Sequence, residues 1–236
     1  MQIYLDSADH REIEKWSAAG IIDGATTNPS ILLKDGVFDL EEGAQRLAKL
    51  LGERPLSVEV TSDDPTQMVS QGRAIARRAP NVVVKIPVTN ASGESCLGVI
   101  HALSREGIAV NTTAILSFNQ AMLAAKAGAA YVSIFAGRIA DEGSDPCVVI
   151  RNVRAWLDEW EYTAKIIVGS IRTVLDIQNA ALAGAHIITI PPQFLPKMVD
   201  HKYTRETVLQ FNRDAERALA QMSEARAAAA SGSNSR

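Results

Sequence analysis

The sequence predicts an α/β protein, a (β/α)₈ TIM barrel with an additional C-terminal helix. First, short runs rich in Val, Ile and Thr alternate with Ala-rich or charged amphipathic segments, which is typical of βα units in a parallel sheet. Second, the amphipathic segments end at Gly20, Gly107, Gly128 and Gly184, and glycine suits the left-handed residue that follows a helix. Third, eight strand-like runs can be counted, and 236 residues fit one such barrel.

The eight predicted strands follow one another with helical segments between them. They cover residues 3–8, 24–29, 56–61, 82–88, 108–115, 131–137, 165–171 and 186–192. The segments "DLEEGAQRLAKLL" and "PTQMVSQGRAIARRA" are typical of the intervening helices. The alternative is an open, doubly wound sheet, which usually carries a Gly-rich dinucleotide turn, and the sequence contains no GxGxxG. The spacing suits successive right-handed crossovers, so a closed barrel is favoured.

A long helical segment follows the eighth strand and leads into a polar tail. Thr204 suits its N-cap. Its apolar residues fall on one stripe, Val208, Phe211, Ala215, Leu219 and Met222. This stripe must cover either the barrel or a neighbouring subunit. We expect residues 1–222 to form a single barrel domain that includes this helix, and residues 223–236 to form a helix extension and a disordered tail.

The composition excludes several classes of protein. A net charge of -3 and a pI near 5.8 give no basic surface for nucleic acid or an anionic membrane. Cys96 and Cys147 form no CxxC pair, which fits a reducing compartment. The start "MQIYLDSADH" lacks the features of a signal peptide, and no apolar run reaches membrane-spanning length. We therefore expect a cytoplasmic protein with no nucleic-acid or membrane partner.

Polar residues recur in the C-terminal halves of the predicted strands, where core packing does not require them. In a barrel these strand ends surround the active site. The set comprises Asp6, Thr26, Thr27, Asn28, Glu59, Lys85, Asn111, Thr113, Ser133 and Ser170, with Arg138 and Arg172 just beyond two strands. We expect these side chains to converge on one rim of the barrel although they are scattered along the chain.

Several of these residues also have a purely structural interpretation. Asp6 and Asn28 could cap the helices that follow them. Glu59 could face solvent on an edge strand, and Thr113 could be present for its β-propensity. The two arginines could be solvated loop residues. The placement of all of them on one rim favours a functional interpretation.

Lys85 lies within the apolar run "VVVKIPV". Burial of an unpaired ammonium is costly, so this lysine must lose its proton or find a partner. A barrel interior is expected to lower its pKa and to make a neutral amine available for attack on a carbonyl. Asp6 and Glu59 could supply the acid and base chemistry that such attack requires. The alternative is a structural ion pair between Lys85 and a carboxylate.

The remaining polar groups indicate an anionic substrate and no metal. Arg138, Ser170 and Arg172 can receive a phosphate through charge-assisted hydrogen bonds. The four histidines are scattered, and no carboxylate cluster has the spacing of metal ligands.

Six segments together resemble the small transaldolases and the related fructose-6-phosphate aldolases. They are "IYLDSA", "DGATTNPSIL", "VVVKIP", "NTTAILSFNQAMLAAKAGAAYVS", "FAGRI" and "SIR". The resemblance runs from residue 2 to about residue 220. It implies a (β/α)₈ barrel whose fourth-strand lysine, here Lys85, forms a Schiff base with a ketose phosphate without any cofactor.

The resemblance also implies a role for each rim residue. Asp6 is then the general acid and base for carbon–carbon cleavage, and Glu59 and Thr113 bind the catalytic water. The substrate-binding residues are Thr27, Asn28, Asn111, Ser133 and Phe135, with Arg138, Ser170 and Arg172 at the phosphate.

Two positions distinguish the branches of this family. Glu59 and Phe135 are the transaldolase combination, whereas the aldolases carry Gln and Tyr at these positions. Phenylalanine cannot protonate the enamine, so we expect transfer of a three-carbon dihydroxyacetone unit from fructose 6-phosphate or sedoheptulose 7-phosphate to an aldose phosphate. Such chemistry belongs to carbohydrate metabolism and the pentose phosphate pathway.

Three alternatives stay open. The chain could be an aldolase that releases free dihydroxyacetone, or a phosphosugar-binding barrel without catalysis. It could also be a transaldolase for a sulfonated or longer-chain sugar, because Ile134 replaces a proline that is frequent in relatives and is expected to border the site. The relatives form pentameric or decameric rings with the C-terminal helix on a neighbour, which implies a homo-oligomer.

Overall fold

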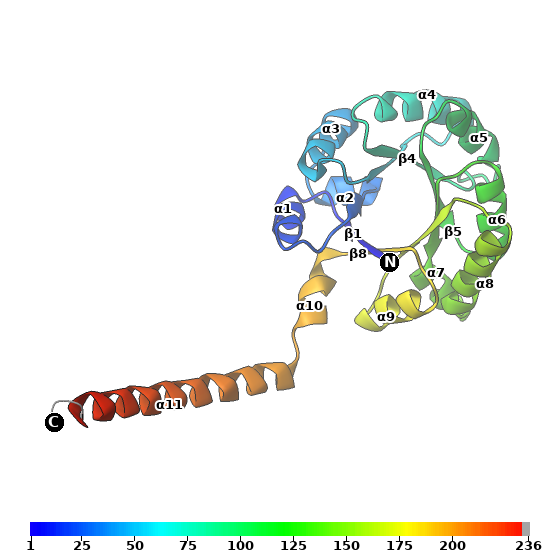
Figure 1. The fold of residues 1–236 in the computed structure, drawn as a ribbon. Coiled ribbons are helices and arrows are strands. Elements are labelled where there is room, and N and C mark those ends of the chain that lie inside the picture. Colours follow the sequence, from blue (N-terminus) through cyan, green and yellow to red (C-terminus); the bar gives the residue numbers. More distant parts are fainter. Residues whose placement is uncertain (233–236) are drawn as a thin grey trace. The chain divides into compact units, whose positions relative to one another are not determined.

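The computed structural model describes residues 1–232 and shows a closed barrel of eight parallel strands (Figure 1). The strands are β1 (Gln2–Asp6), β2 (Gly24–Thr26), β3 (Leu56–Glu59), β4 (Val82–Pro87), β5 (Val110–Ile115), β6 (Tyr131–Phe135), β7 (Lys165–Gly169) and β8 (Ile187–Ile190). Each strand pairs with the next in the sequence, and β8 pairs with β1 to close the barrel. The prediction of a (β/α)₈ barrel is confirmed, and the open sheet is excluded.

Helices connect the strands and form the outer layer (Figure 1). They are α1 (His10–Ala18), α2 (Pro29–Lys34), α3 (Leu40–Leu51), α4 (Pro65–Ala76), α5 (Leu97–Arg105), α6 (Phe118–Lys126), α7 (Ala136–Asp141), α8 (Pro146–Glu159) and α9 (Val174–Leu182). Short polar residues begin most of these helices, because their side chains accept hydrogen bonds from the free N–H groups of the first turn. Asp64 accepts from the N–H of Gln67 in this way, at 2.8 Å.

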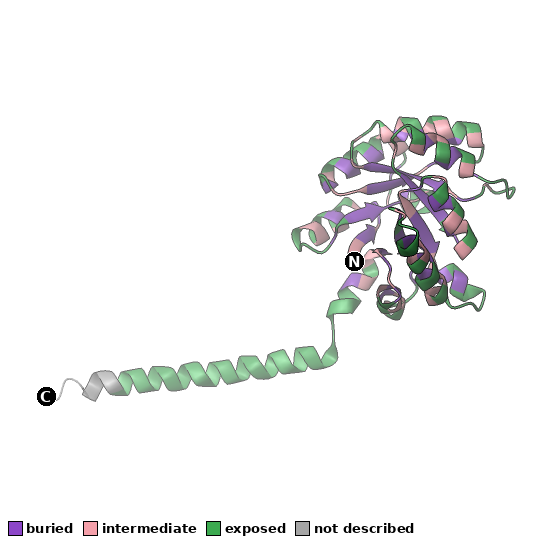
Figure 2. Cartoon of the chain, turned by 45° about the vertical axis from the view of Figure 1, so that its right-hand side comes forward, coloured by how far each residue is buried: buried purple, intermediate pink, exposed green. Residues whose placement is uncertain are grey.

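The barrel interior is divided into an apolar floor and a polar rim. Tyr4, Ile167 and Ile187 are buried together and Tyr131 packs against them, which fills the N-terminal half of the barrel. On three of these four strands the residue two positions later is polar. It points into the barrel as well, because side chains at i and i+2 share one face of a strand. The strands are buried almost throughout their length (Figure 2). The floor therefore supports a layer of polar groups at the C-terminal ends of the strands.

The chain divides into two compact units, Met1–Phe194 and Leu195–Arg236. The sequence predicts one domain over residues 1–222, whereas the unit that holds the barrel ends at Phe194. The second unit contains α10 (Leu195–Val199) and α11 (Lys202–Gly232), after the 3₁₀ turn Pro192–Phe194 of the first. The helix extension predicted for residues 223–236 is present as far as Gly232, and the predicted disordered tail otherwise lies outside the described residues.

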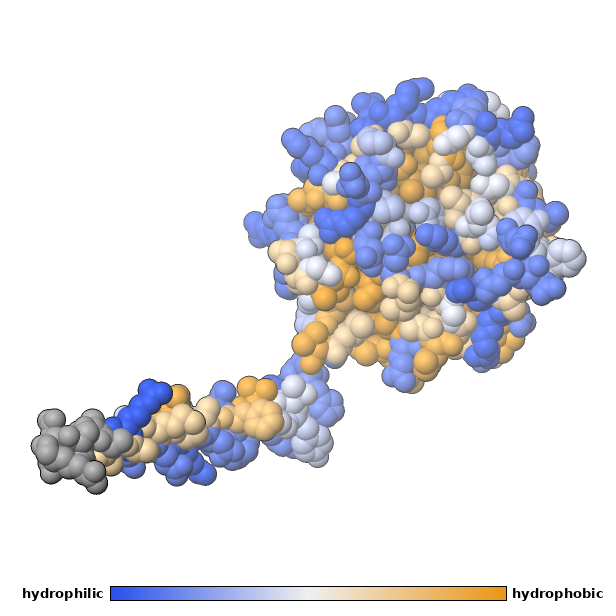
Figure 3. All heavy atoms as spheres, in the orientation of Figure 1, coloured by the Kyte–Doolittle hydropathy of each residue, from blue (hydrophilic) through white to orange (hydrophobic). Residues whose placement is uncertain are grey.

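Helix α11 carries a stripe of apolar side chains. Val208, Phe211, Leu219 and Met222 are 48%, 65%, 67% and 59% exposed. Apolar side chains gather along one side of this helix and polar ones along the other (Figure 3). The predicted stripe is therefore present. None of the helices within residues 1–232 combines the length and the apolar character that crossing a membrane requires.

Candidate active site

A cavity of about 260 Å³ lies at the C-terminal ends of the barrel strands. Eight of the predicted site residues line it, namely Asp6, Asn28, Lys85, Ser133, Phe135, Arg138, Ser170 and Arg172. The other lining residues are Thr26, Gly169, Ile171, Thr189 and Pro191. Residues from the first strand to just beyond the eighth thus meet in one cavity, as the strand-end pattern predicts.

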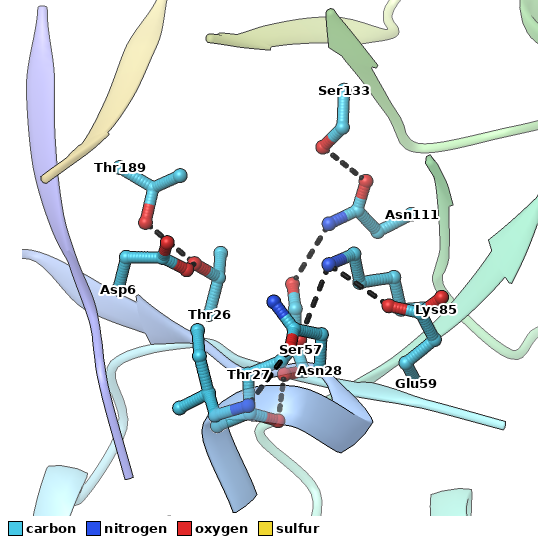
Figure 4. Close-up of polar contacts among 11 residues, drawn as sticks. Asp6, Thr26, Thr27, Asn28, Ser57, Glu59, Lys85, Asn111, Ser133 and Thr189 are labelled. Atoms are coloured by element: carbon cyan, nitrogen blue, oxygen red, sulfur yellow. Dashed lines mark hydrogen bonds and ion pairs between the residues drawn. The ribbon is translucent and has the colours of Figure 1, made fainter. Parts of the chain in front are cut away.

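Two polar contacts hold Lys85 in the cavity (Figure 4). Its side chain is only 5% exposed, and Nζ lies 3.1 Å from Oε2 of Glu59, the residue paired with it across β3 and β4. Nζ also donates a hydrogen bond to the carbonyl of Thr27 at 3.2 Å. The ion pair of the structural alternative is thus present. It also suits nucleophilic chemistry, because Glu59 can take the proton that Lys85 must lose before it attacks a carbonyl.

Asp6 lies in the same polar layer, on β1, and is half-buried. The Thr26 hydroxyl donates a hydrogen bond to its Oδ1 at 2.7 Å. Burial raises the pKa of the Asp6 carboxyl, while the charge of Lys85 and the bond from Thr26 act in the opposite direction. The negative charges of Asp35 and Glu59 add smaller increases. A carboxyl whose raised pKa moves it toward neutral pH beside a buried amine is suited to general acid and base catalysis.

A second hydrogen-bonded chain crosses the other side of the barrel. The Ser133 hydroxyl donates to Oδ1 of Asn111 at 2.8 Å, and the Asn111 amide donates to the Ser57 hydroxyl at 3.1 Å (Figure 4). All three side chains are buried. Asn111 is also paired with Lys85 across β4 and β5. This chain fixes a polar wall next to the lysine.

Two arginines and a strained turn also line the cavity. Arg138, on α7, has no hydrogen-bond or ion-pair partner in the described part of the chain, and Arg172 pairs with Asp141 at 3.0 Å. Ser170 adopts a left-handed φ of 59°, which is uncommon for a residue other than glycine. Its carbonyl accepts a hydrogen bond from the N–H of Gly137, where a Cβ would lie 2.1 Å from that oxygen. This part of the cavity can bind a dianion.

The chain matches the family described as Transaldolase/Fructose-6-phosphate aldolase over residues 3–232. The chain belongs to this family. A "Probable transaldolase" of Dehalococcoides mccartyi is 42% identical over 214 residues, which cover 91% of this chain and 97% of that protein. A "Probable transaldolase 2" of Listeria monocytogenes is 41% identical, with 91% and 95% covered. The predicted family membership is thereby confirmed.

Solved structures confirm the barrel at the level of the fold. A putative lactate oxidase of Pediococcus acidilactici aligns with a TM-score of 0.56, covering 80% of this chain and 62% of that one, at 14% identity. The likeness concerns the fold alone.

The position that was expected to alter the substrate range of this family member does not reach the cavity. Ile134 is fully buried between Ser133 and Phe135, both of which line the cavity. Because neighbouring side chains of a strand point to opposite faces, Ile134 faces the helical layer instead. The expectation that Ile134 borders the site is wrong.

Thr113 and Glu59 do not line the cavity, although Glu59 contacts Lys85, which does. The Thr113 hydroxyl is buried and has no hydrogen-bond partner among the described residues. A register shift between Thr112 and Ile115, with Ala114 at a φ of 57°, shapes β5 at this point.

Asn28 and Thr27 show both structural and functional placements. Asn28 Oδ1 accepts a hydrogen bond from the N–H of Ile31 at 2.9 Å and caps α2, as the structural interpretation predicts, but the residue also lines the cavity. The Thr27 hydroxyl donates to the Ser57 carbonyl at 2.9 Å and does not line the cavity. Thr27 therefore acts on the site through its own carbonyl, which holds Lys85.

Three polar residues of the site received no role from the sequence. Thr26 belongs to the set of strand-end residues named from the sequence, whereas Ser57 and Thr189 do not. Ser57 lies two positions before Glu59 and shares its face, and Thr189 is the single polar residue of its strand. The period of two along each strand could have identified both. Within residues 1–232, no group of three His, Cys, Asp or Glu is placed to hold a metal ion.

Proposed function

We propose that this protein is a transaldolase that moves a dihydroxyacetone unit from a ketose phosphate to an aldose phosphate through a Schiff base on Lys85. The observation that carries the proposal is the burial of Lys85 between Glu59 and the Thr27 carbonyl, in the same cavity as Asp6. The two arginines that line the cavity, Arg138 and Arg172, support a phosphorylated substrate. The printed names of the relatives agree with this reaction.

In the proposed cycle, Lys85 gives its proton to Glu59 and attacks C2 of fructose 6-phosphate or sedoheptulose 7-phosphate. Loss of water forms the protonated imine. Asp6 then takes the proton of the C4 hydroxyl, the C3–C4 electron pair moves onto the imine, and an aldose phosphate leaves. The enamine attacks a second aldose phosphate, and hydrolysis by water held at Glu59 and Thr113 frees the lysine. The lysine itself serves as the electron sink, so no cofactor is required.

The cavity supports transfer over simple cleavage because Phe135 places an apolar ring where the aldolase branch has a hydroxyl. No phenol is then available at this position to protonate the enamine, which persists until an acceptor binds. A fructose-6-phosphate-type aldolase remains the second candidate because the family description names both activities. Ile134 points away from the cavity, so this residue does not support specialisation for a sulfonated or longer sugar.

Borohydride trapping tests the proposal directly. Reduction in the presence of fructose 6-phosphate should add the three-carbon unit to a peptide that contains Lys85, and Lys85→Met should abolish this adduct while the circular dichroism spectrum stays native. An unmodified protein that still binds the sugar phosphate would establish the non-catalytic binding barrel instead. Rapid release of free dihydroxyacetone without an acceptor would establish the aldolase.

We also propose a cytoplasmic homo-oligomer, a pentamer or decamer, in which α11 buries its apolar side on another copy of the chain. The support is the apolar stripe of Val208, Phe211, Leu219 and Met222 along one side of this helix. Burial of such side chains contributes roughly 1.5–3 kcal/mol each. Analytical ultracentrifugation should find a ring-sized particle, and Phe211→Glu should dissociate it; a stable wild-type monomer would refute the proposal.

A further inference from the structure

Three neighbouring strands bring two threonine hydroxyls to the candidate acid–base residue. Thr26 on β2 is paired with Asp6 on β1, and Thr189 lies on β8, the other neighbour of β1. The Thr26 and Thr189 hydroxyl oxygens are 2.5 Å apart although 163 residues separate them in the sequence (Figure 4). Both residues are buried, with 2% and 6% exposure.

The directions of these hydrogen bonds follow from counting protons. A threonine hydroxyl has one proton, and an ionised carboxylate can only accept. When Asp6 is ionised, the Thr26 proton is committed to Oδ1 of Asp6, at 2.7 Å. In the contact between the two threonines, Thr189 must therefore be the donor. The order of donation is Thr189 to Thr26 to Asp6.

We propose that Thr189 is a positioning residue that, through Thr26, keeps Oδ1 of Asp6 an acceptor and assigns the catalytic proton to Oδ2. This proposal rests on the proposed function, in which Asp6 accepts the proton of the substrate's C4 hydroxyl. In that step the O–H bond breaks, the proton bonds to Oδ2, the oxygen's electrons form the C4 carbonyl, and the C3–C4 pair moves to the imine. Thr189 and Thr26 keep their protons throughout.

Packing between β7 and β8 holds Thr189 in the required orientation. A Cβ added to Gly169 would lie 3.3 Å from the methyl carbon of Thr189, so the glycine leaves space for that methyl group. Because a β-branched side chain has few rotamers, a seated methyl group also fixes the direction of the hydroxyl. This accounts for a threonine at the one polar position of a strand that otherwise reads Ile–Ile–Ile.

The charged groups that face Asp6 set the sign of the expected effect. Lys85 from β4 stabilises the carboxylate, whereas Glu59 from β3 and Asp35, which follows α2, oppose it. Loss of the Thr189 donor weakens the bond from Thr26, because linked hydrogen bonds polarise one another. The ionised form of Asp6 is then less stable, and its titration moves to higher pH.

The experiment compares the titration of Asp6 in four proteins. Infrared difference spectra of protein labelled with ¹³C at the aspartate carboxyls, assigned with Asp6→Asn, report the midpoint without any need for catalysis. Thr189→Val should raise this midpoint by about half a pH unit and move the acidic limb of kcat/KM equally. Thr189→Ser keeps the donor and should stay nearer to the wild type.

A matched control separates the relay from general damage to the barrel. Thr112 is buried on β5 and its hydroxyl has no partner among the described residues, so Thr112→Val makes the same change away from Asp6. Its Asp6 midpoint should equal that of the wild type. Thr189→Ala replaces the valine variant if the latter does not fold.

Two outcomes overturn different claims. If Thr189→Val or Thr189→Ala leaves the Asp6 midpoint at the wild-type value, or if Thr112→Val moves it as far, the relay is refuted. If the midpoint moves as expected but borohydride traps no adduct on the wild-type protein, the relay stands and the transaldolase proposal fails.

Discussion

The ion pair between Lys85 and Glu59 makes a strong prediction about stability. Glu59→Ala removes the carboxylate at 3.1 Å. The Lys85 ammonium, 5% exposed, then keeps the Thr27 carbonyl as its one partner among the described residues. Breaking a buried ion pair from one side costs about 3–5 kcal/mol. The Glu59 side chain is 19% exposed, so in Lys85→Met the unpaired carboxylate remains partly hydrated. We therefore expect Glu59→Ala to destabilise the protein more than Lys85→Met does.

A double-mutant cycle measures this coupling. The variant with both changes buries no unpaired charge, so it should be less destabilised than the sum of the single variants by about 2 kcal/mol or more. Urea unfolding followed by circular dichroism, at one fixed protein concentration, gives the free energy of unfolding of each protein. Costs that add to within about 0.5 kcal/mol would refute the buried ion pair.

Further predictions concern the cavity and its backbone. Phe135→Tyr should increase release of free dihydroxyacetone without an acceptor, measured by a coupled dehydrogenase assay; no increase would show that this ring does not set the reaction branch. Arg172→Ala should raise KM for phosphorylated donors roughly 10- to 100-fold, from the loss of a charge-assisted hydrogen bond, and leave KM for unphosphorylated sugars unchanged. Gly137→Ala should lower the free energy of unfolding by about 1–3 kcal/mol, because the added Cβ would lie 2.1 Å from a backbone carbonyl oxygen. Gly98→Ala is the control, since its Cβ would have nothing within 4 Å, and it should be neutral or stabilising. Urea unfolding measures both variants. The pKa of Asp6 in the folded protein is raised above 3.8, so its contribution to stability is present below that pH and is lost as the pH rises through the folded pKa. Asp6→Asn should therefore gain stability relative to the wild type as the pH rises through this window. A difference in unfolding free energy that stays constant with pH would contradict this prediction.

The fold was predictable because each βα unit repeats the same local pattern. Alternation of strand and helix periods, with glycines after helices, determines the barrel without any long-range information. Strand ends were less predictable: β2 ends at Thr26 and not at residue 29, because Asn28 already caps α2. Capping competes locally with strand pairing, and residue type alone does not decide between them.

The candidate site was predictable as a set of strand-end residues but not as a set of contacts. The sequence places Lys85 and Glu59 at strand ends, and only the register of β3 against β4 makes them partners. The contact between Thr26 and Thr189 depends on closure of the barrel, which brings β8 back to β1. The direction in which Thr27 points, with its hydroxyl on Ser57, depends on tertiary packing in the same way.

The two layers of the barrel interior explain how a buried charged site is compatible with a stable fold. Tyr4 and Ile187 supply apolar contacts in the floor, and the residues two positions later, Asp6 and Thr189, supply polar groups in the rim. Each rim group that becomes ionised is costly to bury unless a neighbouring strand provides a partner. The register of the paired strands provides these partners, because it places Glu59 beside Lys85 and Thr26 beside Asp6. The pairing that holds the strands together is therefore also what makes the buried lysine and carboxylate tolerable, so a shift of one residue in either strand pair would remove both the stability and the chemistry.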